Sequence, residues 1–289
     1  MRSTLLAMKA RSMLRNLSCL TNSYGRFGPR AAIKHLPTVG IDQIELPIKN
    51  QGVPSFFKET PLLTDGSTSS DIAAVRDELA AAGVRLSSCN ISSGNPLDPA
   101  VVERTITKLD IAEMLGVSRV VAGAGAAPDD ADRRQTIRHL RQLATAASDR
   151  GILYCCETHP GLCQNAESML QTLSDVDHPA LRINFDTANF FYYNHNVDLP
   201  ATLLQTREFV AHVHLKDTPG GFEEWHFDQL GTGQIDFGIV RRLLDEVGFT
   251  GPYSLELEGI ANEPEPQLRD YESRIAASVA HLRNCGFDD

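Results

Sequence analysis

The stretch AHVHLKD, residues 211–217, places titratable side chains at every second position of an otherwise apolar run. Because side chains alternate between the two faces of a strand, His212, His214 and Lys216 are expected on one face. Two imidazoles and an ammonium group are costly to bury without partners. The pattern therefore indicates either core histidines bonded to the backbone or a metal or substrate site at the end of a strand.

The chain on either side of this stretch alternates short apolar runs with longer amphipathic ones. Strands are predicted at residues 17–23, 41–48, 84–91, 118–123, 152–159, 181–187, 209–217 and 253–259. Clear amphipathic helices are predicted at residues 71–82, 99–115, 131–150, 164–173, 237–247 and 271–285. This alternation predicts an α/β fold, a single-domain (β/α)8 TIM barrel. No G-x-G-x-x-G segment opens a helix after the first strand, which disfavours an open dinucleotide-binding sheet.

The C-terminal ends of the predicted strands are informative, because the active sites of such barrels lie there. Four strand ends in the second half of the chain close on Glu157, Asp186, His214 and Glu256. The first two intervals are 29 and 28 positions, about one βα unit each, and the long segment 219–234 widens the third. His214 is preferred to His212 because it lies nearer the end of its strand.

Neighbouring strand ends converge on the axis of a closed barrel, so these four groups can surround one cation. Three carboxylates and one imidazole form a mostly oxygen donor set, which suits Mn²⁺ or Mg²⁺ and also allows Co²⁺. A structural Zn²⁺ site is disfavoured. The sequence thus predicts a divalent metal cofactor, with Mn²⁺ first.

Several segments carry a resemblance to a known family. NFDTAN at residues 184–189, HVHLKD at 212–217, LGTGQIDF at 230–237 and GFTGPYSLE at 248–256 resemble the xylose isomerase-like TIM barrel superfamily. Within it, the chain is similar to the sugar phosphate isomerase/epimerase branch, including ketose 3-epimerases and inosose dehydratase-like proteins. The resemblance covers roughly residues 17–286 and implies that Glu157, Asp186, His214 and Glu256 are metal ligands.

The resemblance also implies a reaction. A metal-dependent sugar isomerase or epimerase removes a proton beside a metal-bound carbonyl and forms an enediolate. Glu157 and Glu256 would act as the acid/base pair, while Asp186 and His214 hold the ion.

Other side chains near the strand ends, or in segment 219–234, are expected to contact the substrate: His159, Asn189, Lys216, Trp225, His226 and Glu45. Some ketose epimerases carry a histidine where Asn189 stands, which argues against a simple free-ketohexose epimerase. Lys216 is expected either to bind a substrate oxygen or to pair with Asp217. Trp225 is expected either to stack on a sugar or to anchor packing.

Other activities fit the same barrel. A lyase or dehydratase acting on a keto-inositol or 3-keto-glycoside begins with the same proton abstraction. An endonuclease IV-like phosphodiesterase is less favoured, because it needs further metal ligands and a basic track. A non-catalytic sugar-binding barrel is disfavoured by the intact set of acidic strand ends. The net charge of −10 argues against nucleic-acid and anionic-membrane partners.

The remaining expectations concern location and assembly. Residues 1–16 are basic and predict a tail, leader-like or an over-extended start, before a barrel at 17–289. The chain lacks an apolar run of the ~20 residues that span a bilayer. Its six cysteines form no C-x-x-C pair, which favours reduced thiols in a cytoplasmic protein. Barrels of the resembled branch are often dimers or tetramers, so a homodimer or homotetramer is expected.

Overall fold

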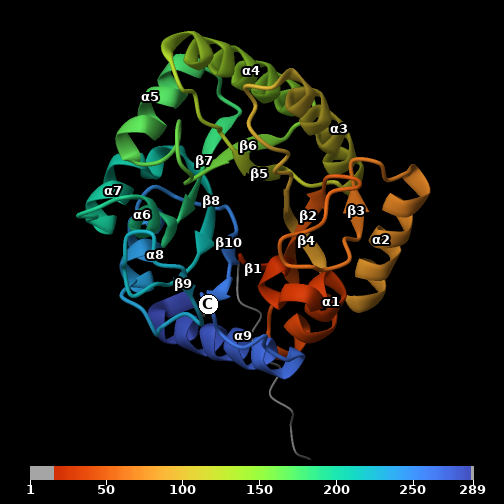
Figure 1. Ribbon diagram of the computed structural model, residues 1–289. Helices are drawn as coiled ribbons and strands as arrows, with labels where there is room; N and C mark the ends of the chain where they lie inside the picture. Colours follow the sequence, from red (N-terminus) through yellow and green to blue (C-terminus); the bar gives the residue numbers. More distant parts are fainter. Residues whose placement is uncertain (1–15, 288–289) are drawn as a thin grey trace, which may run out of the picture.

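The computed structural model describes residues 16–287, which form a closed parallel barrel surrounded by helices (Figure 1). Strand order around the barrel is β1-β10-β8-β7-β6-β5-β4-β2, and β1 also pairs with β2 to close the ring. The (β/α)8 barrel predicted from the sequence is therefore confirmed. The predicted basic tail at residues 1–16 lies, apart from Asn16, outside the described residues.

The elements follow one another in the alternating order that the sequence predicts. The barrel strands are β1 (Leu17–Leu20), β2 (Gln43–Lys49), β4 (Arg85–Asn90), β5 (Arg119–Gly123), β6 (Leu153–Glu157), β7 (Leu181–Asp186), β8 (Val210–Leu215) and β10 (Tyr253–Leu255). The short β3 (Leu63–Thr64) lies beside β2, and β9 (His226–Phe227) pairs antiparallel with β11 (Gly259–Ile260). The helices are α1 (Gly28–Val39), α2 (Ser69–Ala82), α3 (Pro99–Leu115), α4 (Asp130–Ser148), α5 (Ala166–Val176), α6 (Asn189–Tyr193), α7 (Leu199–Thr206), α8 (Phe237–Asp245) and α9 (Leu268–Leu282).

The strand register determines which side chains share the interior of the barrel. Glu157 on β6 pairs with Gly123 on β5 and with Asn184 on β7, while Asp186 on β7 pairs with His214 on β8. Paired residues of parallel strands point to the same face of the sheet. These polar residues therefore share the interior face. The alternate residues, such as Phe185, are fully buried in the hydrophobic core between barrel and helices.

Two strands, β1 and β10, end three and four residues before their predicted ends. After β1 the chain turns into a 3₁₀ helix at Thr21–Phe27, where a strand was expected to reach residue 23. After β10 the chain leaves the barrel, because the Glu258 amide donates to the Phe227 carbonyl and aligns the following residues with β9. Both departures shorten the barrel strands at the end that carries the acidic residues.

The sequence reading also missed helices α1, α6 and α7. Helix α6 is five residues long, too short for an amphipathic repeat to be recognised. Helix α1 carries Pro37 in its last turn, which obscures a helical pattern. Predicted helix ends are correct where glycine supplies a left-handed residue, as at Gly83 (φ 66°) and Gly116 (φ 77°).

The helices can also be judged for membrane insertion. Within residues 16–287, no helix combines the length and the apolar character needed to cross a bilayer.

Candidate metal centre

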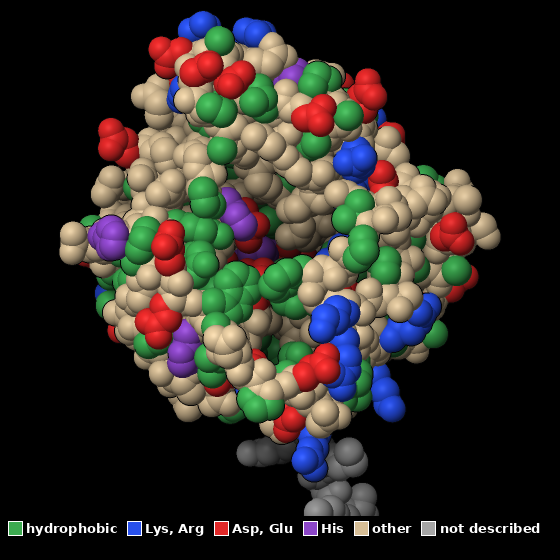
Figure 2. All heavy atoms as spheres, viewed as in Figure 1, with side chains coloured by type: hydrophobic (Ala, Val, Ile, Leu, Met, Phe, Trp, Pro, Cys, Tyr) green, Lys and Arg blue, Asp and Glu red, His purple; other side chains and the backbone are tan. Residues whose placement is uncertain are grey.

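The ends of β6, β7, β8 and β10 meet at one mouth of the barrel. In the view of Figure 2, this face has a central hollow with acidic and histidine side chains at its base and hydrophobic side chains around its rim. Glu157, Asp186, His214 and Glu256 each offer one ligand atom there, and these atoms all lie within 4.8 Å of one another. All four side chains are buried. The structure thus brings together the set of residues that the strand ends indicated.

The imidazole of His214 lies at the centre of this cluster. Its Nδ1 is 2.9 Å from Glu157 Oε1, 3.1 Å from Glu256 Oε2 and 3.9 Å from Asp186 Oδ2. Asp186 reaches it from the position on β7 that pairs with His214. Glu157 pairs with Asn184, two positions before Asp186, and Glu256 lies two positions after Ser254, the partner of His214 on β10. We call these four residues the carboxylate–imidazole cluster.

Asp186 is held in place by the helix that follows it. Its Oδ1 accepts hydrogen bonds from the backbone amides of Ala188 (2.9 Å) and Asn189 (2.8 Å), at the start of α6. The other oxygen, Oδ2, is buried and accepts no hydrogen bond. Glu256 Oε2 is likewise buried without a hydrogen bond, although cationic side chains lie nearby.

Buried acceptors without partners are costly, and a cation between them removes that cost. Asp186 Oδ2 and Glu256 Oε2 both belong to the carboxylate–imidazole cluster. The donor set of three carboxylates and one imidazole is also one that Mn²⁺ and Mg²⁺ accept. The residues present therefore fit a divalent metal ion.

The buried carboxylates favour a positive charge in the carboxylate–imidazole cluster, either a proton on His214 or a cation. Burial opposes protonation of His214, but Glu45 and Glu256 outweigh it and raise the pKa of His214 well above its usual range. Burial raises the pKa of Asp186 to about 7, against the opposing effect of Lys216. Burial also opposes ionisation of Glu256, but Lys216 and His214 outweigh it and lower its pKa to about 2. A metal ion would take the place of a proton on His214, so its binding would release protons.

Lys216 borders the cluster, and its ammonium group contacts four polar side chains. Its Nζ lies 2.8 Å from Glu258 Oε2, 2.9 Å from Glu256 Oε2 and 3.3 Å from Asp186 Oδ2, and donates to Asn189 Oδ1 at 3.2 Å. Burial opposes its charge, but Asp186 and Glu256 raise the pKa of Lys216 well above its usual range. The ion pairs of Lys216 are thus with these three carboxylates, while the predicted partner Asp217 accepts hydrogen bonds from backbone amides instead.

His159 lies beside the cluster, at its exposed side. Its Nε2 is 3.4 Å from Glu157 Oε2, its ring lies 5.4 Å from that of Tyr193, and its side chain is 46% exposed. Burial would raise the pKa of Glu157, but His159 and His214 together hold it well below its usual range. His159 thus has both a contact with the cluster and open surface for a further ligand.

A second polar layer lies below the cluster, deeper in the barrel. His212 Nδ1 donates to Asn184 Oδ1 at 2.8 Å, and its Nε2 is 2.9 Å from Ser88 Oγ. Burial and the neighbouring His214 lower the pKa of His212 well below its usual range. Both nitrogens of His212 therefore have neutral partners, which leaves it outside the cluster.

Glu45 is placed differently from its prediction as a substrate contact. Glu45 lies in the middle of β2, which ends at Lys49, one residue beyond the predicted end. Its carboxylate is fully buried and lies 3.0 and 3.2 Å from His214 Nε2. No surface of Glu45 remains for a substrate hydroxyl group.

Segment 219–234 covers part of the mouth. Trp225 Nε1 donates to the Glu258 carbonyl (3.4 Å), and its ring lies 5.8 Å from that of Phe56 and 5.9 Å from that of Tyr192. His226 is held by the pairing of β9 with β11. Sequence reasoning missed Phe56 and Tyr192, since nothing in the sequence relates three segments so far apart.

One buried carboxylate anchors this segment at both ends. The two oxygens of Asp217 accept hydrogen bonds from the backbone amides of Thr218, Gly231, Gly233 and Ile235, at 2.7 to 3.2 Å. Asp217 is 1% exposed. The ends of the segment are therefore fixed directly beside Lys216.

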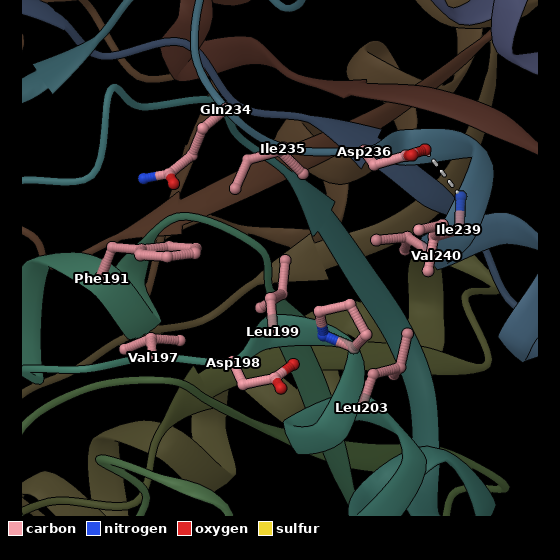
Figure 3. Close-up of a pocket in the computed structure, with 11 residues that line it drawn as sticks. Phe191, Val197, Asp198, Leu199, Leu203, Gln234, Ile235, Asp236, Ile239 and Val240 are labelled. Carbon is pink, nitrogen blue, oxygen red and sulfur yellow. Dashed lines mark hydrogen bonds between the residues drawn. The ribbon is translucent and has the colours of Figure 1, made fainter.

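A separate cavity of about 390 Å³ lies outside the barrel, between α7 and the start of α8 (Figure 3). Its acidic side chains serve as helix N-caps: Asp198 accepts from Ala201 N and Asp236 from Ile239 N. None of the four cluster residues lines it. The candidate metal ligands lie in the mouth of the barrel and not in this cavity.

The fold and the cluster define a (β/α)8 barrel with an acidic mouth, whose residues fit a divalent metal ion. Residues 33–285 match the family described as "Xylose isomerase-like TIM barrel", and the chain belongs to that family. The chain is 24% identical over 254 residues to a ketose 3-epimerase from Arthrobacter globiformis, covering 82% of this chain and 80% of that protein.

Other relatives extend this comparison. An inosose dehydratase from Erwinia tasmaniensis is 26% identical over 151 residues, which is 45% of this chain and 49% of that protein. The chain thus spans about half the length of some of the curated relatives it matches. A crystal structure of a xylose isomerase-like TIM barrel protein from Mycobacterium smegmatis, in complex with magnesium, superposes with a TM-score of 0.71 at 19% identity, over 94% of this chain and 97% of that one.

Proposed function

We propose that this protein is a divalent-metal-dependent sugar isomerase or epimerase, which moves a proton at the carbon beside a substrate carbonyl. One observation carries the proposal: the buried carboxylates of Glu157 and Glu256 approach the same nitrogen of His214, at 2.9 and 3.1 Å. Two carboxylates that face one space are what proton removal and proton return require. The named epimerases among the relatives support the same reaction class.

The ion would be held by Glu157, Asp186, His214 and Glu256. Mn²⁺ is proposed first, with Mg²⁺ or Co²⁺ as alternatives, because the donor set is rich in oxygen. A bound divalent ion supplies positive charge that stabilises the negative charge developing on the substrate during proton removal. The magnesium complex of the Mycobacterium smegmatis protein supports the choice of a divalent ion.

The acid/base pair has the charge state that it needs. The low pKa values of Glu157 and Glu256 keep both carboxylates ionised at neutral pH, as a general base must be. The carboxylate that takes the substrate proton can return the same proton. The other can act as the acid only after it has gained a proton from solvent. His159, Asn189 and Lys216 are proposed to bind substrate oxygens, with Trp225 and His226 at the rim.

A second candidate is a dehydratase acting on a keto-inositol or a 3-keto-glycoside. Lys216 favours it, because its buried ammonium group lies 2.9 Å from Glu256. Elimination needs a proton donor for the departing hydroxyl group, and an ammonium group beside the base can supply that proton. The inosose dehydratases among the relatives support this alternative.

The decisive experiment is a substrate panel in D₂O with Mn²⁺, followed by NMR. The panel contains ketoses, ketose phosphates, inososes and 3-keto-glycosides. We expect deuterium to enter at the carbon beside the carbonyl of one class, together with a new epimer or isomer. Loss of a hydroxyl group in the product would establish the dehydratase instead. Absence of exchange across the whole panel would contradict both proposals.

Variants then test the two-carboxylate mechanism. Glu157→Gln and Glu256→Gln should each slow exchange by about 10²- to 10⁴-fold, the usual contribution of general acid–base catalysis. Glu246→Gln is the control, because this half-exposed glutamate pairs with Arg207 on the outside of the barrel. Exchange at the wild-type rate in both cluster variants would exclude the mechanism.

A further inference from the structure

Glu45 is an acidic residue in the middle of the barrel, and the group that compensates its charge does not come from the neighbouring strands. Its neighbours in the sheet register are Leu20 on β1 and Ser88 on β4, neither of which is charged. A fully buried carboxylate costs several kcal/mol unless a partner compensates its charge. The nearest nitrogen is His214 Nε2, 3.0 Å from Oε2 and 3.2 Å from Oε1.

The other histidine nearby does not fill this role. His212 Nε2 lies 3.5 Å from Glu45 Oε2, beyond a normal N–H···O distance, and already has Ser88 Oγ at 2.9 Å. His212 Nδ1 donates to Asn184 Oδ1 at 2.8 Å, so both ring nitrogens of His212 already have partners. The carboxylate of Glu45 is therefore committed to His214.

The two ring nitrogens of His214 consequently face different environments. Nε2 faces Glu45, and Nδ1 faces Glu157, Asp186 and Glu256. An ionised carboxylate only accepts hydrogen bonds, so Nε2 must carry a proton. The proton that a metal ion replaces is then the one on Nδ1. The amide group Nδ2 of Asn184, 3.0 Å from Nδ1, is a donor and favours the same arrangement.

We propose that Glu45 is a positioning residue, which accepts the Nε2 proton of His214 and thereby fixes Nδ1 as its metal-binding atom. The inference rests on the proposed metal function of the carboxylate–imidazole cluster. A carboxylate bonded to the far nitrogen of a ligand histidine fixes the orientation and tautomer of the ring, and makes Nδ1 a better ligand. β2 thus takes part in the metal site from across the barrel without touching the ion.

A second metal site is the main structural alternative, since Glu45, His212 and His214 also lie close enough together to bind an ion. That site would require His214 to bind metal through both nitrogens, with both ring protons lost. It would also require His212 Nε2 to leave Ser88. A hydrogen bond from Nε2 to Glu45 requires neither change, so the structure favours the positioning role.

The test measures Mn²⁺ affinity of the full chain without substrate, by competition with a fluorescent chelator. Removing such a partner weakens metal binding by about 10- to 100-fold, so Glu45→Ala should raise the Mn²⁺ Kd by that factor. Glu45→Gln keeps an acceptor oxygen and should lose less. Glu59→Gln is the matched control, because Glu59 is also buried but pairs with Lys49 at 2.8 Å; its Kd should equal that of wild type.

The outcomes separate this inference from the proposed function. If Glu45→Ala and Glu45→Gln bind Mn²⁺ as tightly as wild type, or change only the KM for a sugar, the positioning role is wrong even in an active epimerase. If wild type binds Mn²⁺ and the variants bind it weakly, the role stands even when the sugar panel shows no exchange. Wild type that binds no divalent ion contradicts both.

A spectroscopic measurement reads the protonation of His214 in the wild-type protein itself. Long-range ¹H–¹⁵N correlations of the wild-type protein with bound Mg²⁺ report which nitrogen of His214 carries the proton. The His214→Gln variant identifies the signal. A proton on Nε2 is expected, and a proton on Nδ1 would overturn the proposal.

Discussion

The two halves of the barrel mouth differ in charge. The ends of β6, β7, β8 and β10 present the carboxylate–imidazole cluster, and we call this half the acidic arc. The ends of β5, β4, β2 and β1 present the uncharged interior residues Gly123, Asn90, Pro47 and Leu20, and the charge of Lys49, which closes β2, is balanced by an ion pair with Glu59 at 2.8 Å. We call this half the neutral arc. Its acidic residue Glu45 lies one layer deeper and is bonded to the acidic arc.

The contrast indicates a division of tasks. Under the proposed function, charged groups gathered on one side would place a cation off the barrel axis, and the opposite side would be left for a substrate. Gly123 is the clearest sign, because it pairs in register with Glu157, and a Cβ atom there would meet only Gly125 N, at 3.9 Å. The acidic arc thus provides the chemistry, and the neutral arc provides space.

The largest expected effect comes from removing a ligand of the acidic arc. Mn²⁺ at 100 times its Kd should stabilise wild type by about 2.7 kcal/mol, which raises Tm by roughly 5–10 °C in a chain of this size. Asp186→Asn should abolish this shift, because Asp186 Oδ2 is a buried acceptor of the cluster. Differential scanning fluorimetry with and without MnCl₂ measures it. Asp110→Asn, on the outer face of α3, should keep the full shift.

A smaller effect is expected from filling the neutral arc. Gly123→Leu should lower kcat/KM by about 10- to 200-fold, the range for a steric change of this kind in a binding pocket. The Mn²⁺-induced thermal shift should remain, because the new side chain occupies space beside Glu157 without replacing a ligand. Loss of the thermal shift together with activity would show that the neutral arc supports the ion as well.

The smallest effect concerns a buried cation behind the neutral arc. Lys108 of α3 is fully buried and donates to the Ser92 carbonyl at 2.9 Å, just beyond β4. Burial lowers its pKa from 10.5 to about 7, against the opposing effect of Asp65. Between these values the unfolded chain binds a proton that the folded chain does not. The free energy of unfolding should therefore rise with pH, by up to about 1.4 kcal/mol per pH unit.

Urea denaturation at pH 7.5 and 9 of wild type and Lys108→Met measures this contribution. The rise in unfolding free energy between the two pH values should be smaller in the variant by roughly 1–2 kcal/mol. Other titrating groups affect both proteins equally and cancel in the comparison. Identical pH dependence would show that Lys108 keeps its proton in the folded protein.

The sequence predicts the acidic arc well, for a physical reason. Strands of a parallel barrel repeat at nearly constant spacing and end at the same rim, so Asp186 and His214, 28 positions apart, must be neighbours. Because side chains of a strand alternate between its two faces, His212 and Lys216 are predicted on the same face as His214, and the apolar residues between them on the other. Asn184 follows from the same rule, since it lies two positions before Asp186, although it was not predicted.

Other parts of the site could not be predicted, because they depend on closure of the barrel. Glu45 meets His214 across 169 positions of sequence and across the barrel interior, and no local pattern encodes that distance. The depth of Glu45 in the barrel depends on the register of β2 with β1 and β4, which no local pattern in the sequence defines. The contact of Phe56 with Trp225 likewise joins two loops whose paths depend on the complete fold.

The four hydrogen bonds that Asp217 accepts have a consequence for the evolution of such barrels. The side chain of Asp217 holds both ends of segment 219–234. The middle of the segment, including Trp225, can therefore vary without loss of these end contacts. Insertions, deletions or grafts between the secured ends leave the register of β8 unchanged. Under the proposed function, substrate preference could therefore change at the rim without a change in the carboxylate–imidazole cluster.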